Sequence, residues 1–162
     1  MTSAGPRVWP IDGRSAFHEG VLQVLAAAQR TLLLIDPDFE CWPLASRAAE
    51  DALRAALLRG VSLKLLVRQP DWLEREAMRF MRLRRTFAHQ IECRQIPATH
   101  RDEDSAIIAD HRHLVARAAP LSPSCVGHGA FDAPAQAREI TDRYQHAWDE
   151  AEPCLPATTL GL

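Results

Sequence analysis

The feature that most constrains the fold is a regular alternation between stretches of helical period and short apolar runs. Within residues 14–29, apolar side chains recur at helical spacing and predict an amphipathic helix. These are Phe17, Val21, Val24, Leu25 and Ala28. Residues 31–36 then form an apolar run that Pro37 closes. Such a run is typical of a strand buried on both faces. Asp36 and Asp38 flank Pro37, and we expect them to cap this turn.

The same alternation continues along the chain. We expect further helices over 44–59, 72–88 and 134–150, and further strands over 61–67, 91–96, 105–109 and 113–116. Gly60 supplies the left-handed residue that ends a helix at low cost. Asp71 and Glu74 resemble a capping box at the start of the third helix. The polar residues 110–112 predict a hairpin turn between the last two strands.

Strands separated by helices imply parallel crossovers, with the helices covering the sheet. The sequence therefore predicts an α/β fold with a mostly parallel sheet, a C-terminal hairpin and helices on both faces. The chain has 162 residues, and roughly 100–200 residues make one domain. We expect a single domain over 11–152, with residues 1–10 and 153–162 as loose ends.

Composition excludes several functional classes. The net charge of −2 provides no general attraction to nucleic acid or to anionic membranes. No apolar stretch approaches the ~18 residues of a membrane span, and no signal-peptide pattern opens the chain. We expect a soluble, cytoplasmic protein. The four cysteines form no Cys-x-x-Cys pair, which excludes a zinc ribbon, and we expect reduced thiols. They are Cys41, Cys93, Cys125 and Cys154.

Three segments carry a family resemblance. Residues 52–66, which include Arg59-Gly60-Val61, are similar to the helix-to-strand passage of the phospholipase D superfamily. The strand that ends at Asp36 resembles the opening segment of that family, and residues 142–148, with Tyr144 and Trp148, resemble its closing helix. The resemblance covers roughly residues 14–150. It implies one half of a phospholipase D-like enzyme. Because family members with one motif per chain assemble as two-fold dimers, it also implies a symmetric homodimer.

The catalytic signature of that family is His-x-Lys-x-x-x-x-Asp. Aligning the strand 105–109 with the signature places Asp110 at its aspartate, Ser105 at its lysine and Glu103 at its histidine. In the family the histidine attacks phosphorus and the lysine neutralises phosphate charge. Glutamate is a weak nucleophile that repels a phosphodiester, and serine supplies no cation. Losing both groups removes the mechanism.

The resemblance therefore implies a catalytically inactive binding or scaffold module, with no cofactor, whose inherited crevice is lined by Glu103, Ser105 and Asp110. A second hypothesis is a phosphodiesterase or hydrolase with a rebuilt site that uses His100, His111 or His113. These histidines could also ligate a metal, but they match no known ligand motif, and we expect none.

A third hypothesis is a regulatory subunit that docks an anionic group or an acidic protein through an arginine-rich helix face. Its residues are Arg75, Arg79, Arg82 and Arg85. A solvated helix face is the alternative interpretation. With four Trp, five Phe and one Tyr, the chain gives little support to a base-stacking surface for nucleic acid.

Overall fold

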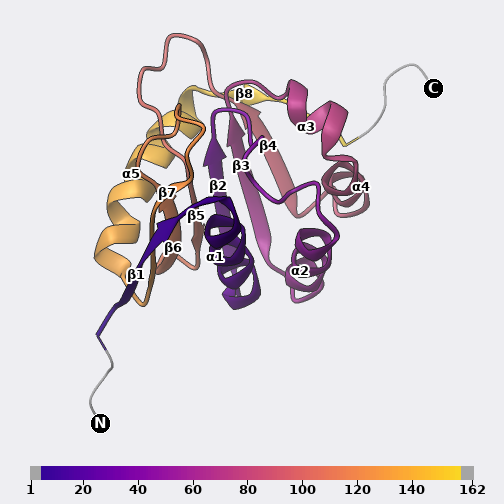
Figure 1. The fold of residues 1–162 in the computed structure, drawn as a ribbon. Helices are drawn as coiled ribbons and strands as arrows, with labels where there is room; N and C mark the ends of the chain where they lie inside the picture. Colours follow the sequence, from indigo (N-terminus) through magenta and orange to yellow (C-terminus); the bar gives the residue numbers. More distant parts are fainter. Residues whose placement is uncertain (1–4, 158–162) are drawn as a thin grey trace, which may run out of the picture.

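The computed structural model describes residues 5–157, which form an open eight-stranded sheet with the strand order β1-β7-β6-β5-β2-β3-β4-β8 (Figure 1). The strands are β1 (Arg7–Asp12), β2 (Thr31–Asp36), β3 (Ser62–Val67), β4 (Ile91–Gln95), β5 (Ala106–Ala109), β6 (His113–Arg117), β7 (Val126–Phe131) and β8 (Glu152–Pro153). The helices are α1 (Arg14–Ala27), α2 (Arg47–Leu58), α3 (Asp71–Glu76), α4 (Met78–Thr86) and α5 (Pro134–Glu150).

The predicted α/β class and the helices on both faces are confirmed, but the sheet is mixed. The strands β2, β3 and β4 are parallel, as the helices between them require, while every other pairing is antiparallel. The predicted hairpin is β5–β6. Its turn places Asp110 and His111 at φ 55° and 57°, and positive φ at both central residues matches the right-handed twist of the strands.

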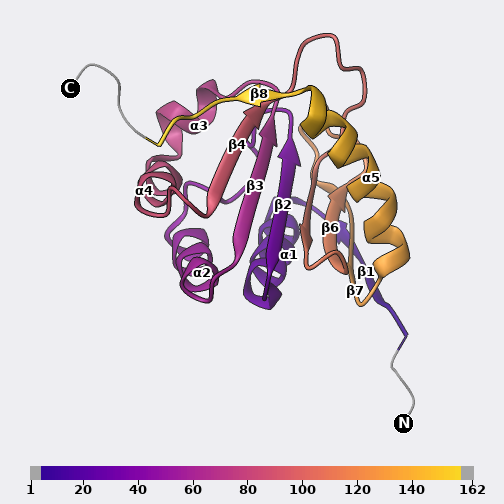
Figure 2. The ribbon, with the colours of Figure 1, turned by 180° about the vertical axis from the view of Figure 1, so that it is seen from behind.

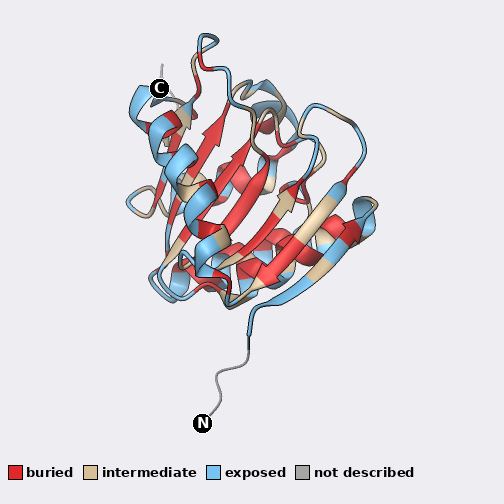
Figure 3. Cartoon of the chain, turned by 90° about the vertical axis from the view of Figure 1, so that its left-hand side faces the viewer, coloured by how far each residue is buried: buried red, intermediate tan, exposed pale blue. Residues whose placement is uncertain are grey.

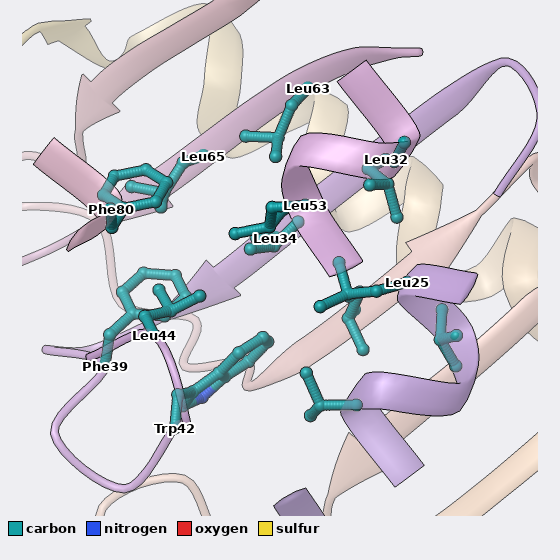
Figure 4. Packing of buried hydrophobic residues seen from close by; sticks show 14 of the residues in the cluster. Leu25, Leu32, Leu34, Phe39, Trp42, Leu44, Leu53, Leu63, Leu65 and Phe80 are labelled. Carbon is teal, nitrogen blue, oxygen red and sulfur yellow. The ribbon is translucent and has the colours of Figure 1, made fainter. Parts of the chain in front are cut away.

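The two faces of the sheet carry different helices. The helices α1, α2, α3 and α4 lie on one face, and α5 lies on the other over the β5–β7 half (Figures 1 and 2). Leu34 and Leu65 are fully buried in the larger of two apolar clusters. The loop after β2 points Phe39 and Trp42 into the same cluster (Figure 4). Figure 3 shows the contrast between the buried strands and the exposed outer surface of α5.

Several predicted boundaries were wrong. Residues 7–10, expected as a loose end, form part of β1, which pairs with β7, and β7 itself was not predicted. At the other end, β8 pairs with β4, and Leu155 is buried. Residues 1–4 and 158–162, the rest of the expected loose ends, lie outside the described residues.

The single helix expected over 72–88 is two helices, because the backbone leaves helical geometry at Ala77, with φ −96° and ψ 56°. The helix expected over 44–59 begins at Arg47, where Ser46 caps it by accepting a hydrogen bond from the Ala49 amide at 3.1 Å. Among residues 5–157, no helix combines the length and the apolar character of a membrane span.

Candidate functional site

The antiparallel pairings bring the ends of four neighbouring strands, β2, β5, β6 and β7, to the same end of the sheet. Ile35 faces Ala106 and Ala106 faces Ala116, so the next residues along, Asp36, Ser105 and Arg117, lie side by side. The Arg117 amide donates to the Ser105 carbonyl at 2.9 Å. In β7, Gly127 pairs with Arg117 and completes the row, and His128 pairs with Ala116 one residue further in.

A buried ion pair lies in the middle of this end of the sheet. Arg117 Nη1 lies 3.0 Å from Asp36 Oδ1, and the two side chains are 3% and 1% exposed. Asp36 Oδ2 also accepts hydrogen bonds from the amides of Phe39 and Asp38, at 2.7 and 3.1 Å. Arg117 Nη2 donates to the Ser122 carbonyl at 2.6 Å. The pair therefore ties the loop after β2 to the loop after β6.

Two opposing effects set the ionisation of Asp36. Burial raises the pKa of this carboxyl above its ordinary value of 3.8, because a charged group loses its hydration. The neighbouring Ser105 side chain and the Phe39 and Asp38 amides lower the pKa in part. The Arg117 guanidinium, at ion-pair distance, also favours the charged carboxylate.

A cavity of about 310 Å³ opens between β5, β6 and α5, on the face of the sheet opposite the side chains of the ion pair. Ser105 and Arg117 line it and are only 2% and 7% exposed. Arg117 Nε has no hydrogen-bond partner among residues 5–157, and the Ser105 side chain interacts with Asp36. Gln136 and His128 also line the cavity, and His128 Nε2 lies 3.2 Å from Gln136 Oε1. Ser105 Oγ and Arg117 Nε are both closed off from solvent, and their side chains point toward the α1 face of the sheet, where Arg117 lies over the Phe17 ring. The polar side chains that the cavity offers a ligand therefore include His128 and Gln136.

Glu103 and Ser105, which the resemblance aligns with the signature histidine and lysine, both border this cavity. Ser105 directly precedes β5, and Glu103 lies on the loop between β4 and β5. The Glu103 carboxylate is 3.0 Å from Arg68 Nε. Arg68 also donates to the carbonyls of Pro97 and His100, at 3.0 and 2.9 Å. Arg68 therefore holds this loop, and with it Glu103, against the end of β3.

Asp110, expected in the same crevice, lies instead at the opposite end of the strands, beside the start of β2. Its carboxylate accepts hydrogen bonds from three successive amides between α1 and β2: Gln29 at 2.9 Å, Arg30 at 2.7 Å and Thr31 at 3.0 Å. Burial acts to raise the pKa of Asp110, but these hydrogen bonds outweigh it and lower the pKa below 3.8. The expected place of Asp110 in the crevice is wrong, and its contacts give it a structural role.

Replacing Asp110 with asparagine is expected to lower the free energy of unfolding by about 1–2 kcal/mol at neutral pH, because the amides lose a charged acceptor. Because the pKa of Asp110 is lowered in the native state, the native carboxylate takes up its proton at a lower pH than the unfolded chain does. The stabilisation is therefore fully present at pH values above 3.8, and it is lost as the pH falls through the native pKa. Urea unfolding of both proteins at neutral pH and in acid checks this. An equal difference at both pH values would contradict it.

The three histidines do not gather at one site. His100 Nδ1 lies 2.9 Å from Glu150 Oε2 of α5. His111 and His113 lie at the β5–β6 turn with Asp110, at the far end of the strands, where His113 Nδ1 accepts from the Asp132 amide at 3.1 Å. Within the described part of the chain, no three His, Cys, Asp or Glu side chains are placed to hold a metal ion.

The arginine-rich face is divided by the break at Ala77. Arg79 and Arg82 of α4 reach Glu50 of α2, at 3.7 and 3.4 Å. On the other side of the break, Arg75 donates to the Asp71 carbonyl in its own helix at 3.4 Å. Arg85 is exposed near the end of α4. Two of the four arginines therefore serve contacts between helices within the chain.

Comparisons with known proteins support the fold. Nuc from Salmonella typhimurium, a phospholipase D family member, is 18% identical with a TM-score of 0.68, over 92% of this chain and 98% of that one. NucT from Helicobacter pylori is 8% identical with a TM-score of 0.61, over 92% and 99%. TrmBL2, an archaeal chromatin protein that binds DNA, is 20% identical with a TM-score of 0.69, over 91% of this chain and 55% of that one.

The expected phospholipase D-like fold is therefore confirmed, and at these identities the likeness concerns the fold alone. The search of curated proteins gave no match. A family model described as "Domain of unknown function (DUF7931)" matches residues 13–160, and the chain belongs to that family.

Proposed function

We propose that this domain is a phospholipase D-like binding module that no longer transfers phosphoryl groups and that takes its ligand in the cavity beside Arg117. The observation that carries the proposal is a cavity of about 310 Å³ that Glu103 and Ser105 border and that the polar side chains of His128 and Gln136 line. The resemblance aligns the catalytic lysine of the family with Ser105.

The charges around the cavity disfavour a phosphodiester. Arg117 is paired with Asp36, and Arg143 donates to both oxygens of Asp104, at 3.1 and 3.0 Å. Glu139 adds another carboxylate to the lining. A phosphodiester entering here meets cations that are already neutralised and carboxylates that repel it. Uncompensated burial of a charged ligand is costly, so the site favours an uncharged polar group.

The polar lining indicates what that group carries. The Gln136 amide both donates and accepts hydrogen bonds, and the neutral His128 ring carries one donor and one acceptor. A carbonyl or hydroxyl group of a ligand could form hydrogen bonds with these side chains, and one such bond contributes about 0.5–1.5 kcal/mol. The cavity volume of about 310 Å³ falls at the small end of ligand sites, roughly 300–1,000 Å³. We therefore propose a small uncharged ligand with a carbonyl or hydroxyl group.

Replacing Gln136 with alanine tests this proposal. Small amides, sugars and alcohols should raise the melting temperature of the wild type, and this shift should shrink in Gln136→Ala, because the ligand loses a hydrogen-bonding side chain. The exposed Gln145 of the same helix lies outside the lining of the cavity. It gives the matched control, Gln145→Ala, which should keep the full shift. Equal shifts in all three proteins would remove the cavity from the proposal.

The loss of catalysis needs its own measurement. Purified protein should hydrolyse bis(p-nitrophenyl) phosphate no faster than buffer, because neither Glu103 nor Ser105 can replace the nucleophile and the cation. Hydrolysis that disappears in Glu103→Gln would instead support an enzyme. The rebuilt histidine site has weaker support, since His100 and Glu150 pair with each other away from the lining of this cavity.

The proposal keeps the two-fold homodimer that the resemblance implies. Light scattering at several concentrations measures the mass in solution, and a constant monomer mass would remove the dimer. The same sample should be titrated with double-stranded DNA, because TrmBL2 binds DNA. Salt-sensitive binding that is lost in Arg79→Glu/Arg82→Glu would favour the arginine-rich face over the cavity.

A further inference from the structure

The fold gathers its four cysteines into two pairs. Cys125 belongs to the larger apolar cluster and Cys41 packs against that cluster, and the Cys41 side chain lies close enough to Cys125 to raise its pKa. The Cys154 amide donates to the Cys93 carbonyl at 3.0 Å. The β4–β8 register pairs Arg94 with Pro153 and so sets Cys93 opposite Cys154. All four are free thiols in this structure, so each pair is a potential dithiol.

The Cys41–Cys125 pair joins the same two loops as the buried ion pair. Cys41 lies in the loop that starts after Asp36, and Cys125 ends the loop that starts after Arg117. Both cysteines are also anchored at the start of α1. His18 Nε2 lies 2.7 Å from the Cys41 carbonyl oxygen, and the Gly13 amide donates to the Cys125 carbonyl at 2.9 Å. The two backbones are therefore held so that the thiols remain together.

We infer that Cys41 and Cys125 form a redox-active site, in which a peroxide oxidises the two thiols to a disulfide that fixes the loops beside the cavity. Cys41 is half-buried and borders a second cavity of about 540 Å³, whereas Cys125 is 4% exposed. Cys41 is therefore the thiol that a small oxidant reaches first, and Cys125 is the resolving thiol.

The chemistry balances in two steps. The Cys41 thiolate attacks one peroxide oxygen, the O–O bond breaks, and the departing hydroxide takes up a proton to give water and a sulfenic acid on Cys41. The Cys125 thiolate then attacks the Cys41 sulfur, and the S–S bond forms as the S–O bond breaks. The departing hydroxide gives a second water. The two thiols lose two electrons in total, and the peroxide gains them.

The other pair provides an internal comparison. Burial raises the pKa of Cys93 and of Cys154 to about 12, which leaves very little thiolate at neutral pH. Burial and the contact with Cys41 also raise the pKa of Cys125, but the positive charges of Arg117 and Arg14 lower it in part. The cationic groups thus favour reaction at Cys125 and its partner over reaction at Cys93 and Cys154.

The test treats the full chain with hydrogen peroxide, alkylates the remaining thiols with iodoacetamide and measures the intact mass. Half of the alkylation sites should be lost, with a mass change of two hydrogen atoms that dithiothreitol reverses. A non-reducing digest of the wild type should contain one linked peptide pair, joining Cys41 to Cys125. Cys41→Ser and Cys125→Ser should both abolish the link, and Cys154→Ser should keep it.

Three outcomes would overturn the inference: a link that joins Cys93 to Cys154, complete alkylation of all four thiols after peroxide, or oxygen addition to Cys41 without a link. The peptide map needs only the wild-type chain, so it decides the question even where a serine variant does not fold. The result is independent of the cavity ligand, because no ligand is added.

Discussion

Replacing Arg117 with methionine is expected to lower the free energy of unfolding by about 3–5 kcal/mol, because it leaves a buried carboxylate without its cation. Asp36 is 1% exposed, so water cannot take the place of the guanidinium. The Ser122 carbonyl also loses its donor. Urea unfolding monitored by circular dichroism measures the loss. The dependence of the unfolding free energy on urea concentration should be the same in both proteins if both unfold in two states.

An exposed pair of the same residue types gives the matched control. Arg112 Nη2 lies 2.6 Å from Asp132 Oδ1, with side chains 54% and 50% exposed, and Arg112→Met should cost less than about 1 kcal/mol. Adding Asp36→Asn to Arg117→Met should recover part of the loss, because it removes the unpaired charge and keeps an acceptor for the Phe39 amide. Equal losses for Arg117→Met and Arg112→Met would contradict the prediction.

The pH dependence follows from the raised pKa of Asp36. The native carboxyl binds its proton at a higher pH than the unfolded chain does, so this group makes stability fall as the pH rises from 3.8 through the native value. In Arg117→Met the unpaired carboxyl can also become neutral by taking up a proton. The stability difference between the variant and the wild type should therefore narrow in acid.

Replacing Gly127 with alanine is the second large expected effect, a loss of about 2–3 kcal/mol. A Cβ atom at this position would lie 1.9 Å from the Ala116 carbonyl oxygen of the neighbouring strand. Because the obstacle is backbone, β6 and β7 would have to separate, and with them the pair formed by Arg117 and Gly127. Thermal and urea unfolding measure the loss.

Gly5 supplies the control for this substitution. A Cβ atom on Gly5 would meet no atom within 4 Å, and Gly5→Ala should change stability by less than about 0.5 kcal/mol. If Gly127→Ala unfolds with the same free energy as Gly5→Ala, the close approach of the two strands is not a constraint on this sheet.

The sequence predicts the central elements because their own residues determine them. The apolar run at 31–36 is β2, and Gly60, at φ +92°, ends α2 as expected. The strand β7 is missed because Gly127 and Gly129 disfavour a strand locally. The reason for a glycine at position 129 is visible only in the folded structure, where Trp9 of β1 covers Gly129 and leaves no room for a Cβ atom.

The candidate site could be predicted only in part. Counting along the signature places Glu103 and Ser105 beside the cavity, but Asp36 and Arg117 are separated by 81 residues, and no local pattern reports their contact. For Asp110 a signal was present in the sequence. Five residues of extended chain span about 17 Å, so a strand that begins after Ser105 must carry Asp110 to the far end of the strands.

The place of β1 has a consequence for how the chain folds. Arg7 pairs with Phe131 and Asp12 with Val126, so β1 has no partner strand until residues 126–131 have left the ribosome. Contacts this distant in sequence form late and slowly. Since β7 must first pair with β6, we expect β1 to join the sheet late in folding, after the strands β2 to β6 have assembled.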